Sequence, residues 1–281
     1  MSDDAPVVVK IGGARAVDPA GAVADIATIA ADGTPLIVVH GGSTAVDDLL
    51  SALGTEPEYV TTPSGVTGRF TDAETMDVVT MAMAGRVNTD LTVALRNAGA
   101  NALGLSGVDG GLLTGPRKSA VRVLEDGKKK IRRGDHAGSI ESVNAGLLEL
   151  LVDAGYLPVV GLPMLAEDGT AVNTDADRAA AAVAGAVGGR LVILTDVAGI
   201  YRDPADPTTA FDEIDSPGDL EAVSDAAEGF MTRKVMAAEE ALEAGASAVV
   251  VADANVDEPI QAALAGAGTR FTPAAIAGDS A

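Results

Sequence analysis

The chain has 281 residues, of which 47% are hydrophobic but only 2% aromatic, so its core must be built from Val, Ile, Leu and Ala. It has no Cys and two His, which excludes a disulfide framework and a thiolate or multi-histidine metal centre. Acidic residues number 41 against 19 basic ones, giving a net charge of −22. This composition is typical of proteins from salt-loving organisms, the alternative being an ordinary acidic protein.

The first six residues are polar and acidic, unlike a secretory leader with its basic start and apolar stretch. No apolar run approaches the roughly 18 residues that a membrane span requires. We therefore expect a cytoplasmic protein with no membrane partner.

Apolar runs and helical patterns alternate along the chain. Runs typical of strands buried on both faces cover residues 6–11, 35–39, 102–105, 157–161, 190–194 and 248–251. One helix is predicted to start at Asp18-Pro19, a second to end at Leu53, and a third to run from a capping box of Thr71 with Glu74 to Gly99. Further helices are predicted over residues 138–154, 174–186 and 230–244. The alternation predicts an α/β fold, a three-layer αβα sandwich around a mostly parallel open sheet.

The segment from Arg117 to Arg133 departs from the acidic composition. Its eight basic and two acidic residues give a local charge of +6, which leaves −28 on the remainder. Glu125-Asp126-Gly127 predicts a turn between strand-like flanks, and so a hairpin. The alternatives are a solvated hairpin and a nucleic-acid patch. Nucleic acid is disfavoured, because the remainder repels a polyanion and the segment has no aromatic residue for stacking.

Two glycine pairs, Gly12-Gly13 and Gly41-Gly42, directly follow predicted strands. Glycine lets the backbone approach a phosphate closely, and helix N-termini offer it unpaired N–H groups. In an open parallel sheet, ligands bind outside the carboxyl ends of the strands, where these pairs lie. The alternative is two ordinary strand-to-helix turns, and neither pair matches a phosphate-loop or dinucleotide fingerprint.

Two isolated lysines stand out. Lys10 lies near the end of an apolar strand, where its charge is costly unless it faces a negative group. Lys234 is the only other Lys outside the basic segment and lies in a predicted helix. The alternatives are a Lys10 that snorkels to solvent and a Lys234 on an exposed face. Because the chain has only six Lys, we favour a function for both.

Three further segments carry polar side chains. Asn173-Thr174-Asp175-Ala176-Asp177 opens a helix, where its acids either cap the helix or organise lysines and a Mg-nucleotide. Arg69 precedes a helix start and either clamps a carboxylate or faces solvent. The residues from Thr195 to Tyr201 follow a strand as a turn-rich loop.

In combination, these motifs resemble the amino-acid kinase superfamily and, within it, the N-acetylglutamate kinase group. The motifs occur in chain order as Lys10-Ile11-Gly12-Gly13, His40-Gly41-Gly42, Val172-Asn173-Thr174-Asp175, Thr195-Asp196 through Tyr201, and Gly229-x-Met231-x-x-Lys234. The resemblance covers almost the whole chain and implies the carbamate kinase-like fold. It also implies one continuous sheet with a substrate and carrier lobe at residues 1–165 and an ATP-binding lobe at residues 166–281.

A narrower resemblance is to the kinases that act on glutamate or 2-aminoadipate held by a LysW-type amino-group carrier protein. It rests on Gly104–Gly110, Arg117-Lys118-x-x-Val121, the basic hairpin, and Asn144 with Gly155-Tyr156-Leu157-Pro158. In that group the hairpin docks the acidic carrier, as charge complementarity favours. The docking residues so implied are Arg117, Lys118, Lys128, Lys130 and Arg132.

The resemblance implies ATP-dependent phosphorylation of a side-chain carboxylate in arginine or lysine biosynthesis, with Mg2+ held mainly by ATP and no metal site on the protein. An ionised carboxylate needs no general base, so catalysis rests on positioning and charge neutralisation. The catalytic residues implied are Lys10, Lys234 and Asp175, with Asp175 holding the two lysines. The implied binding residues are Gly41, Gly42, Arg69 and Asn173 for substrate and Gly12, Gly13, Thr195, Asp196 and Tyr201 for nucleotide.

The chain also departs from its relatives. Ser43 replaces a third glycine, and Ala171 stands where many free-substrate relatives have Asn. Because the chain starts almost at the first strand, we expect a homodimer without the N-terminal helix of arginine-inhibited hexamers. The alternatives are free N-acetylglutamate as substrate, another small substrate such as UMP or carbamate, and a non-catalytic regulator, which retention of both lysines disfavours. Glutamate and 2-aminoadipate differ by one methylene, so both stay open.

Overall fold

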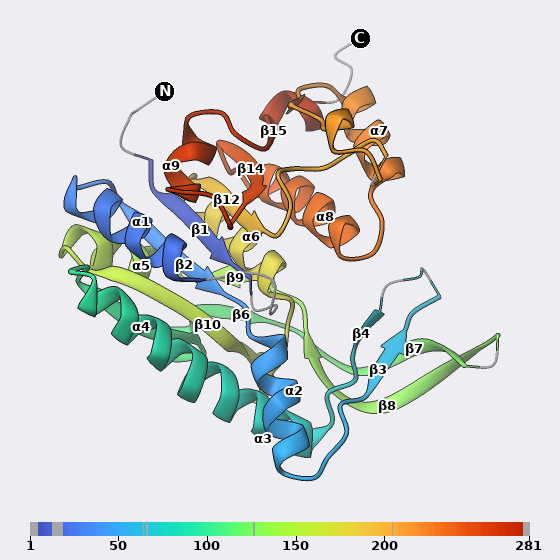
Figure 1. Cartoon of the computed structure of the whole chain (residues 1–281). Helices are drawn as coiled ribbons and strands as arrows, with labels where there is room; N and C mark the ends of the chain where they lie inside the picture. The colour runs from blue at the N-terminus through green and yellow to red at the C-terminus, as the bar shows by residue number, and fades with distance from the viewer. Residues whose placement is uncertain are drawn as a thin grey trace.

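The computed structural model describes residues 5–12, 19–63, 65, 67–125, 127–203 and 205–277. They form three layers, with one mixed, mostly parallel sheet between two layers of helices (Figure 1). The α/β fold class predicted from the sequence is therefore confirmed.

The central sheet has 11 strands within the described residues. They are β1 (Val7–Ile11), β2 (Leu36–His40), β5 (Ala102–Gly107), β6 (Leu113–Gly115), β9 (Ser142–Val143), β10 (Leu157–Ala166), β11 (Ala171–Val172), β12 (Arg190–Thr195), β13 (Glu213–Ile214), β14 (Ala248–Asp253) and β15 (Thr269–Phe271). Their order is β13-β15-β14-β12-β1-β2-β10-β6-β9, and β5 and β11 also pair with β10. Neighbours in the run β14-β12-β1-β2-β10 pair in parallel, so their carboxyl ends share one edge.

Helices cover both faces of the sheet. They are α1 (Pro19–Ala31), α2 (Ser43–Ala52), α3 (Ala73–Thr80), the π-helical segment η1 (Met81–Val87), α4 (Asn88–Asn97), α5 (Ala145–Asp153), α6 (Ala176–Ala186), α7 (Pro217–Ala226), α8 (Phe230–Glu243) and α9 (Pro259–Leu264), with short 3-10 turns at Asp109–Gly111, Pro207–Thr209 and Pro273–Ile276. No helix in the described part of the chain is long and apolar enough to cross a membrane.

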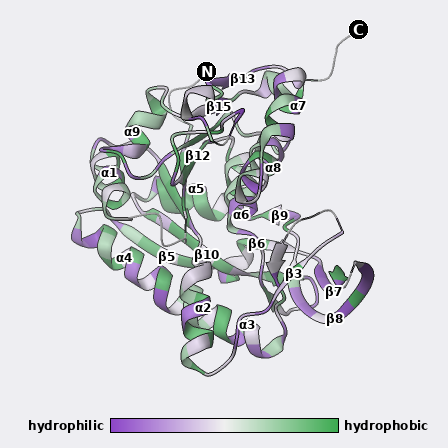
Figure 2. Ribbon diagram, turned by 45° about the vertical axis from the view of Figure 1, so that its right-hand side comes forward, coloured by the Kyte–Doolittle hydropathy of each residue, from purple (hydrophilic) through white to green (hydrophobic). Residues whose placement is uncertain are grey.

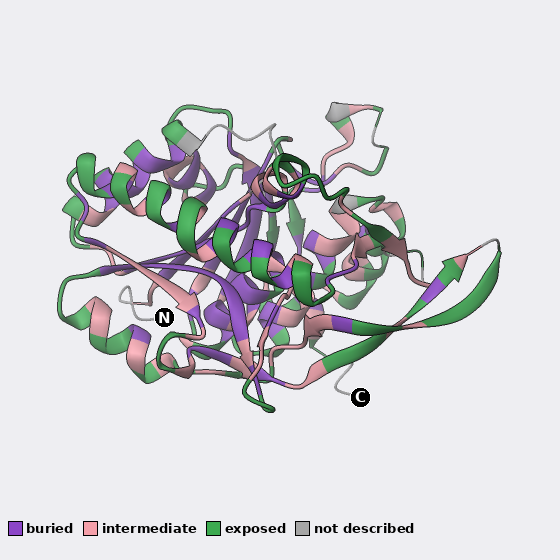
Figure 3. Cartoon of the chain, turned by 90° about the horizontal axis from the view of Figure 1, so that it is seen from below, coloured by how far each residue is buried: buried purple, intermediate pink, exposed green. Residues whose placement is uncertain are grey.

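Strands β1, β2, β10, β12 and β14 read as continuous apolar runs because both of their faces are buried (Figure 3). In β1, Val8 joins the core beneath α2, α3, α5, α6 and α8, whereas Val7 and Val9 join the core beneath α1, α4 and α9. Small side chains such as Ala179 and Ala180 of α6 are fully buried and let that helix lie close to the sheet. A core built from Val, Ile, Leu and Ala, as the composition predicts, is confirmed.

Two hairpins project together from one side of the sheet (Figure 1). The shorter pairs β3 (Tyr59–Thr61) with β4 (Thr67–Arg69), and the longer pairs β7 (Arg117–Glu125) with β8 (Lys128–Gly138). The hairpin predicted in the basic segment is therefore confirmed. We call β7 and β8 the basic hairpin.

Two helix boundaries differ from the predictions. The N-cap of α3 is Asp72, which accepts the N–H of Thr75 at 2.8 Å, so the predicted capping box of Thr71 is wrong. Thr71 is fully buried, and its hydroxyl accepts a hydrogen bond from another segment. The helix predicted over residues 138–154 is wrong in its first half, because Asn144 caps α5 and the preceding residues complete β8 and form β9.

Candidate active site

Two buried lysines meet at the carboxyl edge of the parallel strands. Lys10 of β1 is 6% exposed and Lys234 of α8 is 9% exposed. Asp177 of α6 lies between them, with Oδ1 2.6 Å from the Nζ of Lys10 and Oδ2 3.4 Å from the Nζ of Lys234. We call these three residues the two-lysine cluster. One carboxylate thus holds two ammonium groups that would otherwise repel each other.

Asp175, the predicted holder of the lysines, has a different role. Its Oδ1 caps α6 by accepting the N–H groups of Asp177 and Arg178 at 2.8 and 3.2 Å. Its Oδ2 lies 3.2 Å from a guanidinium nitrogen of Arg233. The prediction that Asp175 bridges the two lysines is therefore wrong. The physical reason is the helix start: the N-cap side chain folds back onto the first turn, and the residue two positions later projects into the site.

The packing of α6 on α8 sets the distances within the cluster. Gly185 lets the helices approach closely, since a Cβ there would lie 2.3 Å from the Cβ of Ala244. Arg178 of α6 donates from Nε to Glu240 of α8 at 2.8 Å, and its Nη2 contacts the same carboxylate. Together with the ion pairs of Asp175 and Asp177, three contacts of opposite charge link the two helices.

Burial and charge act against each other in the cluster. Burial alone would raise the pKa of Asp177, but the charges of Lys10 and Lys234 outweigh it and lower the pKa. For Lys234, burial and then the nearby charge of Lys10 lower the pKa, although Asp177 partly offsets them. With two cations and one anion, the cluster carries a net positive charge that attracts an anionic ligand.

Arg69, the last residue of β4, lies in a polar network with residues of α2 and β3. It donates to the backbone oxygen of Ser43 and to the hydroxyl of Tyr59, both at 3.1 Å, and pairs with Asp47. The hydroxyl of Tyr59 donates to the other oxygen of Asp47 at 2.9 Å. The Arg69 side chain is only 7% exposed, so the alternative of a solvent-facing Arg69 is wrong. Its guanidinium is held rigidly, as bidentate carboxylate binding requires.

Asn173 joins the base of the basic hairpin to the end of β4. Its N–H donates to the oxygen of His136 and its oxygen accepts the N–H of Gly138, both at 2.7 Å. Its side chain donates to the hydroxyl of Thr71 at 3.2 Å, and the N–H of Thr71 donates to the buried carboxylate of Asp135 at 3.3 Å. Asn173 therefore connects three segments that are far apart in sequence.

The glycine turns differ in how much backbone they leave to a ligand. The N–H of Gly41 donates to the oxygen of Ile11 at 3.0 Å, so it completes the sheet. The prediction that the Gly41 N–H binds substrate is therefore wrong. Gly42 is the N-cap of α2, and a Cβ there would lie 2.5 Å from the sulfur of Met83. Gly12 follows β1 at the same edge, and Gly13 lies outside the described residues.

The predicted nucleotide residues lie at the next strand end. Thr195 closes β12 and is buried, and its hydroxyl donates to the Asp196 carboxylate at 3.2 Å. Asp196 is exposed in the following turn. The hydroxyl of Tyr201 accepts the N–H of Ala198 at 3.2 Å and so closes that turn. The turn lies beside β1 because β1 and β12 pair in parallel.

The basic hairpin has two unlike faces. On the inner face, Lys130 pairs with Glu125 at 2.8 Å, while Arg132 pairs with Glu58 and stacks 4.2 Å from the ring of Phe70. The outer face alternates charged and apolar residues, all exposed: Ala120, Arg122, Leu124, Lys129, Ile131 and Arg133. Figure 2 shows this mixture of hydrophilic and hydrophobic residues along the hairpin.

Among the described side chains, none of the three outer-face cations, Arg122, Lys129 and Arg133, forms an intramolecular ion pair. Of the predicted docking residues, Arg117, Lys130 and Arg132 each have a carboxylate within 4 Å, at Asp168, Glu125 and Glu58. Lys118 and Lys128 are exposed. The hairpin therefore pairs Arg117, Lys130 and Arg132 with carboxylates of the protein and presents the outer-face cations to solvent.

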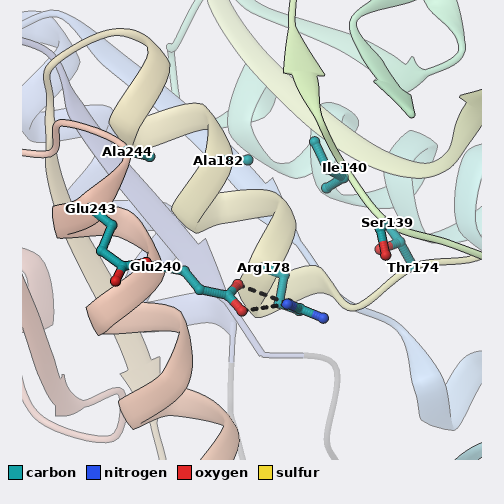
Figure 4. A pocket seen from close by; sticks show the side chains of 8 residues that line it. All are labelled: Ser139, Ile140, Thr174, Arg178, Ala182, Glu240, Glu243 and Ala244. Atoms are coloured by element: carbon teal, nitrogen blue, oxygen red, sulfur yellow. Dashed lines mark hydrogen bonds and ion pairs between the residues drawn. The ribbon is translucent and has the colours of Figure 1, made fainter. Parts of the chain in front are cut away.

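A cavity of about 420 Å³ lies between α6 and α8 (Figure 4). Arg178 and Glu240, which pair with each other, line it together with Thr174 and Ala182. Arg178 and Ala182 lie one turn apart on α6, whereas Asp177 points about 100° away around the helix. The cavity is therefore on a different face of α6 from the two-lysine cluster, and none of the predicted site residues lines it.

The comparisons with known proteins agree with this geometry. The model of the amino acid kinase family matches residues 5–253. The chain belongs to the amino acid kinase family. The resemblance found in the sequence is therefore confirmed.

Three relatives illustrate its place in the amino acid kinase family. The "[LysW]-aminoadipate kinase" of Deinococcus radiodurans is 44% identical over 264 residues, covering 94% of this chain and 90% of the relative. The protein of the same name from Thermus thermophilus is 42% identical over 269 residues, covering 94% of this chain and 98% of the relative. The "Acetylglutamate kinase" of Methanopyrus kandleri is 44% identical over 247 residues, covering 87% and 93%.

Solved structures share the fold. The N-acetylglutamate synthase of Neisseria gonorrhoeae superposes with a TM-score of 0.74 at 25% identity, and the chain spans 96% of its own length and 59% of that protein. Carbamate kinase from Giardia lamblia bound to AMP-PNP superposes with a TM-score of 0.65 at 18% identity, covering 97% and 99%. The predicted carbamate kinase-like fold is thereby confirmed.

Sequence reasoning missed several residues of the site. Asp177 had been noted beside Asp175, and only the exact start of α6 distinguishes their roles. Arg233 directly precedes Lys234 and pairs with Asp175, a contact that no local sequence pattern predicts. Asp47 of α2 and Tyr59 of β3 contact Arg69 only in the folded chain, so no local sequence pattern predicts their place in the site.

Proposed function

We propose that the protein transfers the γ-phosphoryl group of ATP to the side-chain carboxylate of glutamate or 2-aminoadipate attached to an acidic LysW-type carrier protein. The observation that carries this proposal is the two-lysine cluster, which holds two cations and one anion, each 9% exposed or less. A buried charge without a partner costs several kcal/mol, on the order of 3–5 kcal/mol when a pair is broken. An anionic group placed between the lysines removes that cost.

The cluster suits phosphoryl transfer because negative charge is spread over the oxygens of the moving group. Lys10 on β1 and Lys234 on α8 would contact those oxygens from different elements, and Asp177 holds both in place beforehand. The acceptor carboxylate is ionised at neutral pH, so no side chain has to remove a proton. The transfer yields an acyl phosphate and ADP.

The surroundings of the cluster fit a magnesium ion carried by ATP. In the described part of the chain no three His, Cys, Asp or Glu side chains gather to hold a metal ion. Asp177, the carboxylate at the cluster, already binds two lysines. Bound Mg2+ would take its ligands from phosphate oxygens and neutralise part of their charge. We propose that residues 166–281 form the ATP-binding lobe, in which Thr195, Asp196 and Tyr201 bind the nucleotide, and that Gly12 and Gly13 contact it from the other lobe.

The acceptor would bind between Arg69 of the substrate lobe, residues 1–165, and Asn173, which lies near the start of residues 166–281. The described hydrogen bonds use three of the five N–H groups of Arg69, which leaves two for a carboxylate. We propose that Arg69 and Asn173 hold the α-carboxylate of the acceptor while Gly42 contacts its reacting end. The α-amino group would then point away from the cluster, where the carrier is attached.

The basic hairpin supplies the carrier surface in this proposal. Its base contains His136 and Gly138, which hydrogen-bond directly to Asn173, so a carrier on the hairpin lies next to the acceptor site. The outer-face cations Arg122, Lys129 and Arg133 have no internal partner among the described residues, and Leu124 and Ile131 between them are 39% and 63% exposed. Cations beside apolar side chains suit an acidic protein surface. We propose the outer face as the principal docking surface, with Arg117, Lys118, Lys128, Lys130 and Arg132 contributing around it.

The relatives support the carrier-bound substrate, since two that are 42–44% identical are named "[LysW]-aminoadipate kinase". Free N-acetylglutamate is the second candidate, supported by the 44% identical "Acetylglutamate kinase" of Methanopyrus kandleri. The choice between glutamate and 2-aminoadipate, the homodimer and the cytoplasmic location stay predictions.

Hydroxylamine trapping tests the proposal, because it converts an acyl phosphate to a stable hydroxamate. The protein with Mg-ATP is incubated in parallel with glutamate-loaded carrier, aminoadipate-loaded carrier, unloaded carrier and free N-acetylglutamate. We expect hydroxamate with loaded carrier only, and the faster of the two loads identifies the pathway. Hydroxamate from free N-acetylglutamate alone would replace the proposal with its second candidate. Absence of hydroxamate from all four would refute carboxylate phosphorylation.

A further inference from the structure

A buried polar pair lies directly beneath the turn that follows β2. His40 is 1% exposed and Asn88, the first residue of α4, is 6% exposed. The Nδ2 of Asn88 lies 2.9 Å from the Nε2 of His40, 2.8 Å from the oxygen of Val159 and 3.2 Å from the oxygen of Leu105. The Nδ1 of His40 lies 3.0 Å from the oxygen of Gly41.

These contacts determine the protonation of His40. The oxygens of Val159 and Leu105 only accept hydrogen bonds, so the group of Asn88 that faces them must be its NH2. An NH2 group cannot accept a hydrogen bond, so the Nε2 of His40 that faces it at 2.9 Å must be unprotonated. The proton of a neutral imidazole then lies on Nδ1, where it donates to the oxygen of Gly41. Burial also lowers the pKa of His40, which favours the neutral ring.

The hydrogen bond to Gly41 fixes one peptide plane at the site. In a trans peptide the C=O and the following N–H point in opposite directions. Because the Gly41 C=O points at the buried imidazole, the N–H of Gly42 points away from it, at the carboxyl edge of the sheet. We propose that His40, held by Asn88 as the Nδ1–H tautomer, is a positioning residue that aims the Gly42 N–H at the reacting oxygens. This inference rests on the proposed function for the role of Gly42.

The surrounding backbone is shaped to hold the pair. A Cβ at Gly161 of β10 would lie 2.4 Å from the Nε2 of His40, and one at Gly104 of β5 would lie 2.2 Å from the Oδ1 of Asn88. The π-helical segment η1 ends at Val87, directly before Asn88, and packs Met83 against Gly42. Extra residues in a π turn shift the register of a helix and often occur at functional sites. Gly104, Gly161 and the π-helical segment η1 thus leave space for the hydrogen bonds that join Asn88, His40 and the Gly41 oxygen.

The tautomer is measured directly by two-dimensional 15N NMR of the imidazole rings. The chain has two histidines, so the His40 signals are those that vanish in His40→Asn. We expect the pattern of a neutral ring protonated on Nδ1 at neutral pH. A ring protonated on Nε2, or on both nitrogens, would overturn the inference whether or not the protein phosphorylates the carrier.

Two substitutions separate positioning from packing. In His40→Asn, the side-chain amide nitrogen takes the place of Nδ1 and can still donate to the Gly41 oxygen. In His40→Gln, the amide nitrogen takes the place of Nε2, so the Gly41 oxygen has no donor. We expect kcat of His40→Asn to fall by about 3-fold and that of His40→Gln by about 10- to 100-fold, with KM for ATP changed by less than about 2-fold. Gln matches the volume of His more closely, so a packing role predicts the reverse ranking and would refute positioning.

Thr92→Val is the matched control on the same helix. Thr92 also faces Gly104, and its buried hydroxyl has no hydrogen-bond partner among the described residues. Its substitution should leave kcat within about 2-fold of the parent. A loss equal to that of His40→Gln would assign the effect to packing of α4 and count against the inference. An inactive parent with the expected His40 spectrum would refute the proposed function and leave the hydrogen-bond chain standing.

Discussion

The two-lysine cluster and the basic hairpin both present positive charge, but in opposite surroundings. In the cluster, Lys10 and Lys234 are at most 9% exposed and share one carboxylate. On the hairpin, the side chain of Lys130 is 49% exposed and its pair with Glu125 lies in solvent. Charges act strongly in a buried site and are screened by water and salt at a surface. The cluster is therefore suited to chemistry, and the hairpin to reversible recognition.

The largest effect is expected from removing one charge of the cluster. Lys10→Met and Lys234→Met should each lower kcat by about 1,000-fold or more, because in the proposed mechanism each removes a cation that contacts the transferring phosphoryl group. The measurement is hydroxamate formation with saturating loaded carrier. Circular dichroism and the melting temperature should show that the fold persists. Near-normal kcat in either variant would remove that lysine from the mechanism.

The next effect distinguishes Asp177 from Asp175. Asp177→Asn leaves two ammonium groups side by side in a buried site, so the free energy of unfolding should fall by about 3–5 kcal/mol. Asp175→Asn keeps a good N-cap and loses only a partly exposed pair with Arg233, which should cost less than about 1 kcal/mol. Urea denaturation measures both. Equal losses would show that Asp175 shares in holding the lysines.

Much of this contrast was predictable from the sequence. Lys10 in an apolar strand and Lys234 in a helix stood out because the chain has so few lysines, and the structure brings them to one carboxylate. The basic hairpin followed from eight bases around a turn, and β7 and β8 form it. All six strands of the main apolar runs were predicted, and five of them, β1, β2, β10, β12 and β14, are buried on both faces, which requires apolar residues throughout.

The remainder depended on exact element ends and tertiary contacts. Moving the start of α6 by two residues exchanges the roles of Asp175 and Asp177, and helix ends are the least predictable feature of a sequence. The N–H of Gly41 is used by Ile11 because β1 and β2 are neighbours, which no local motif reveals. The assignment of hairpin cations to faces required the register that pairs Arg122 with Ile131.

The two faces of the hairpin give the third prediction. Lys129→Glu with Arg133→Glu should raise KM for loaded carrier by about 10-fold at low salt, because both cations face solvent and have no ion-pair partner among the residues that the structure describes. Lys128→Glu with Lys130→Glu changes the net charge equally, but Lys130 is already engaged by Glu125, so we expect about 3-fold. Steady-state kinetics against carrier concentration measure both, and KM for ATP should stay constant.

Salt sharpens this test. At about 1 M salt the screening length is about 3 Å, so the two double variants and the parent should converge in KM, while the loss in Lys10→Met should persist. A larger effect from the inner pair would move the docking surface to the predicted residues Lys128 and Lys130. An unchanged KM in both double variants would refute docking on the hairpin.

The smallest effect is a pH dependence of the buried cluster. Burial and the charge of Lys10 lower the pKa of Lys234 below its ordinary value of 10.5, so its ammonium form is lost at a lower pH than in a free lysine. In the proposed mechanism the charged form is the active one, so kcat/KM for ATP should decline as pH rises toward 10.5. Bound phosphate favours the charged lysine, so the decline in kcat should lie at higher pH. ADP formation measured from about pH 6.5 to about pH 10 gives both profiles.

Lys234→Arg is the control for that profile, because a guanidinium stays charged throughout this range. Its kcat should be lower than that of the parent, since the fork of Arg does not reproduce the position of Nζ, but the alkaline decline in kcat/KM should be absent. The same decline in the variant would assign it to another group. Raising the salt concentration should leave the decline of the parent in place, because the interactions that lower the pKa are buried, whereas it should abolish the differences between the hairpin variants.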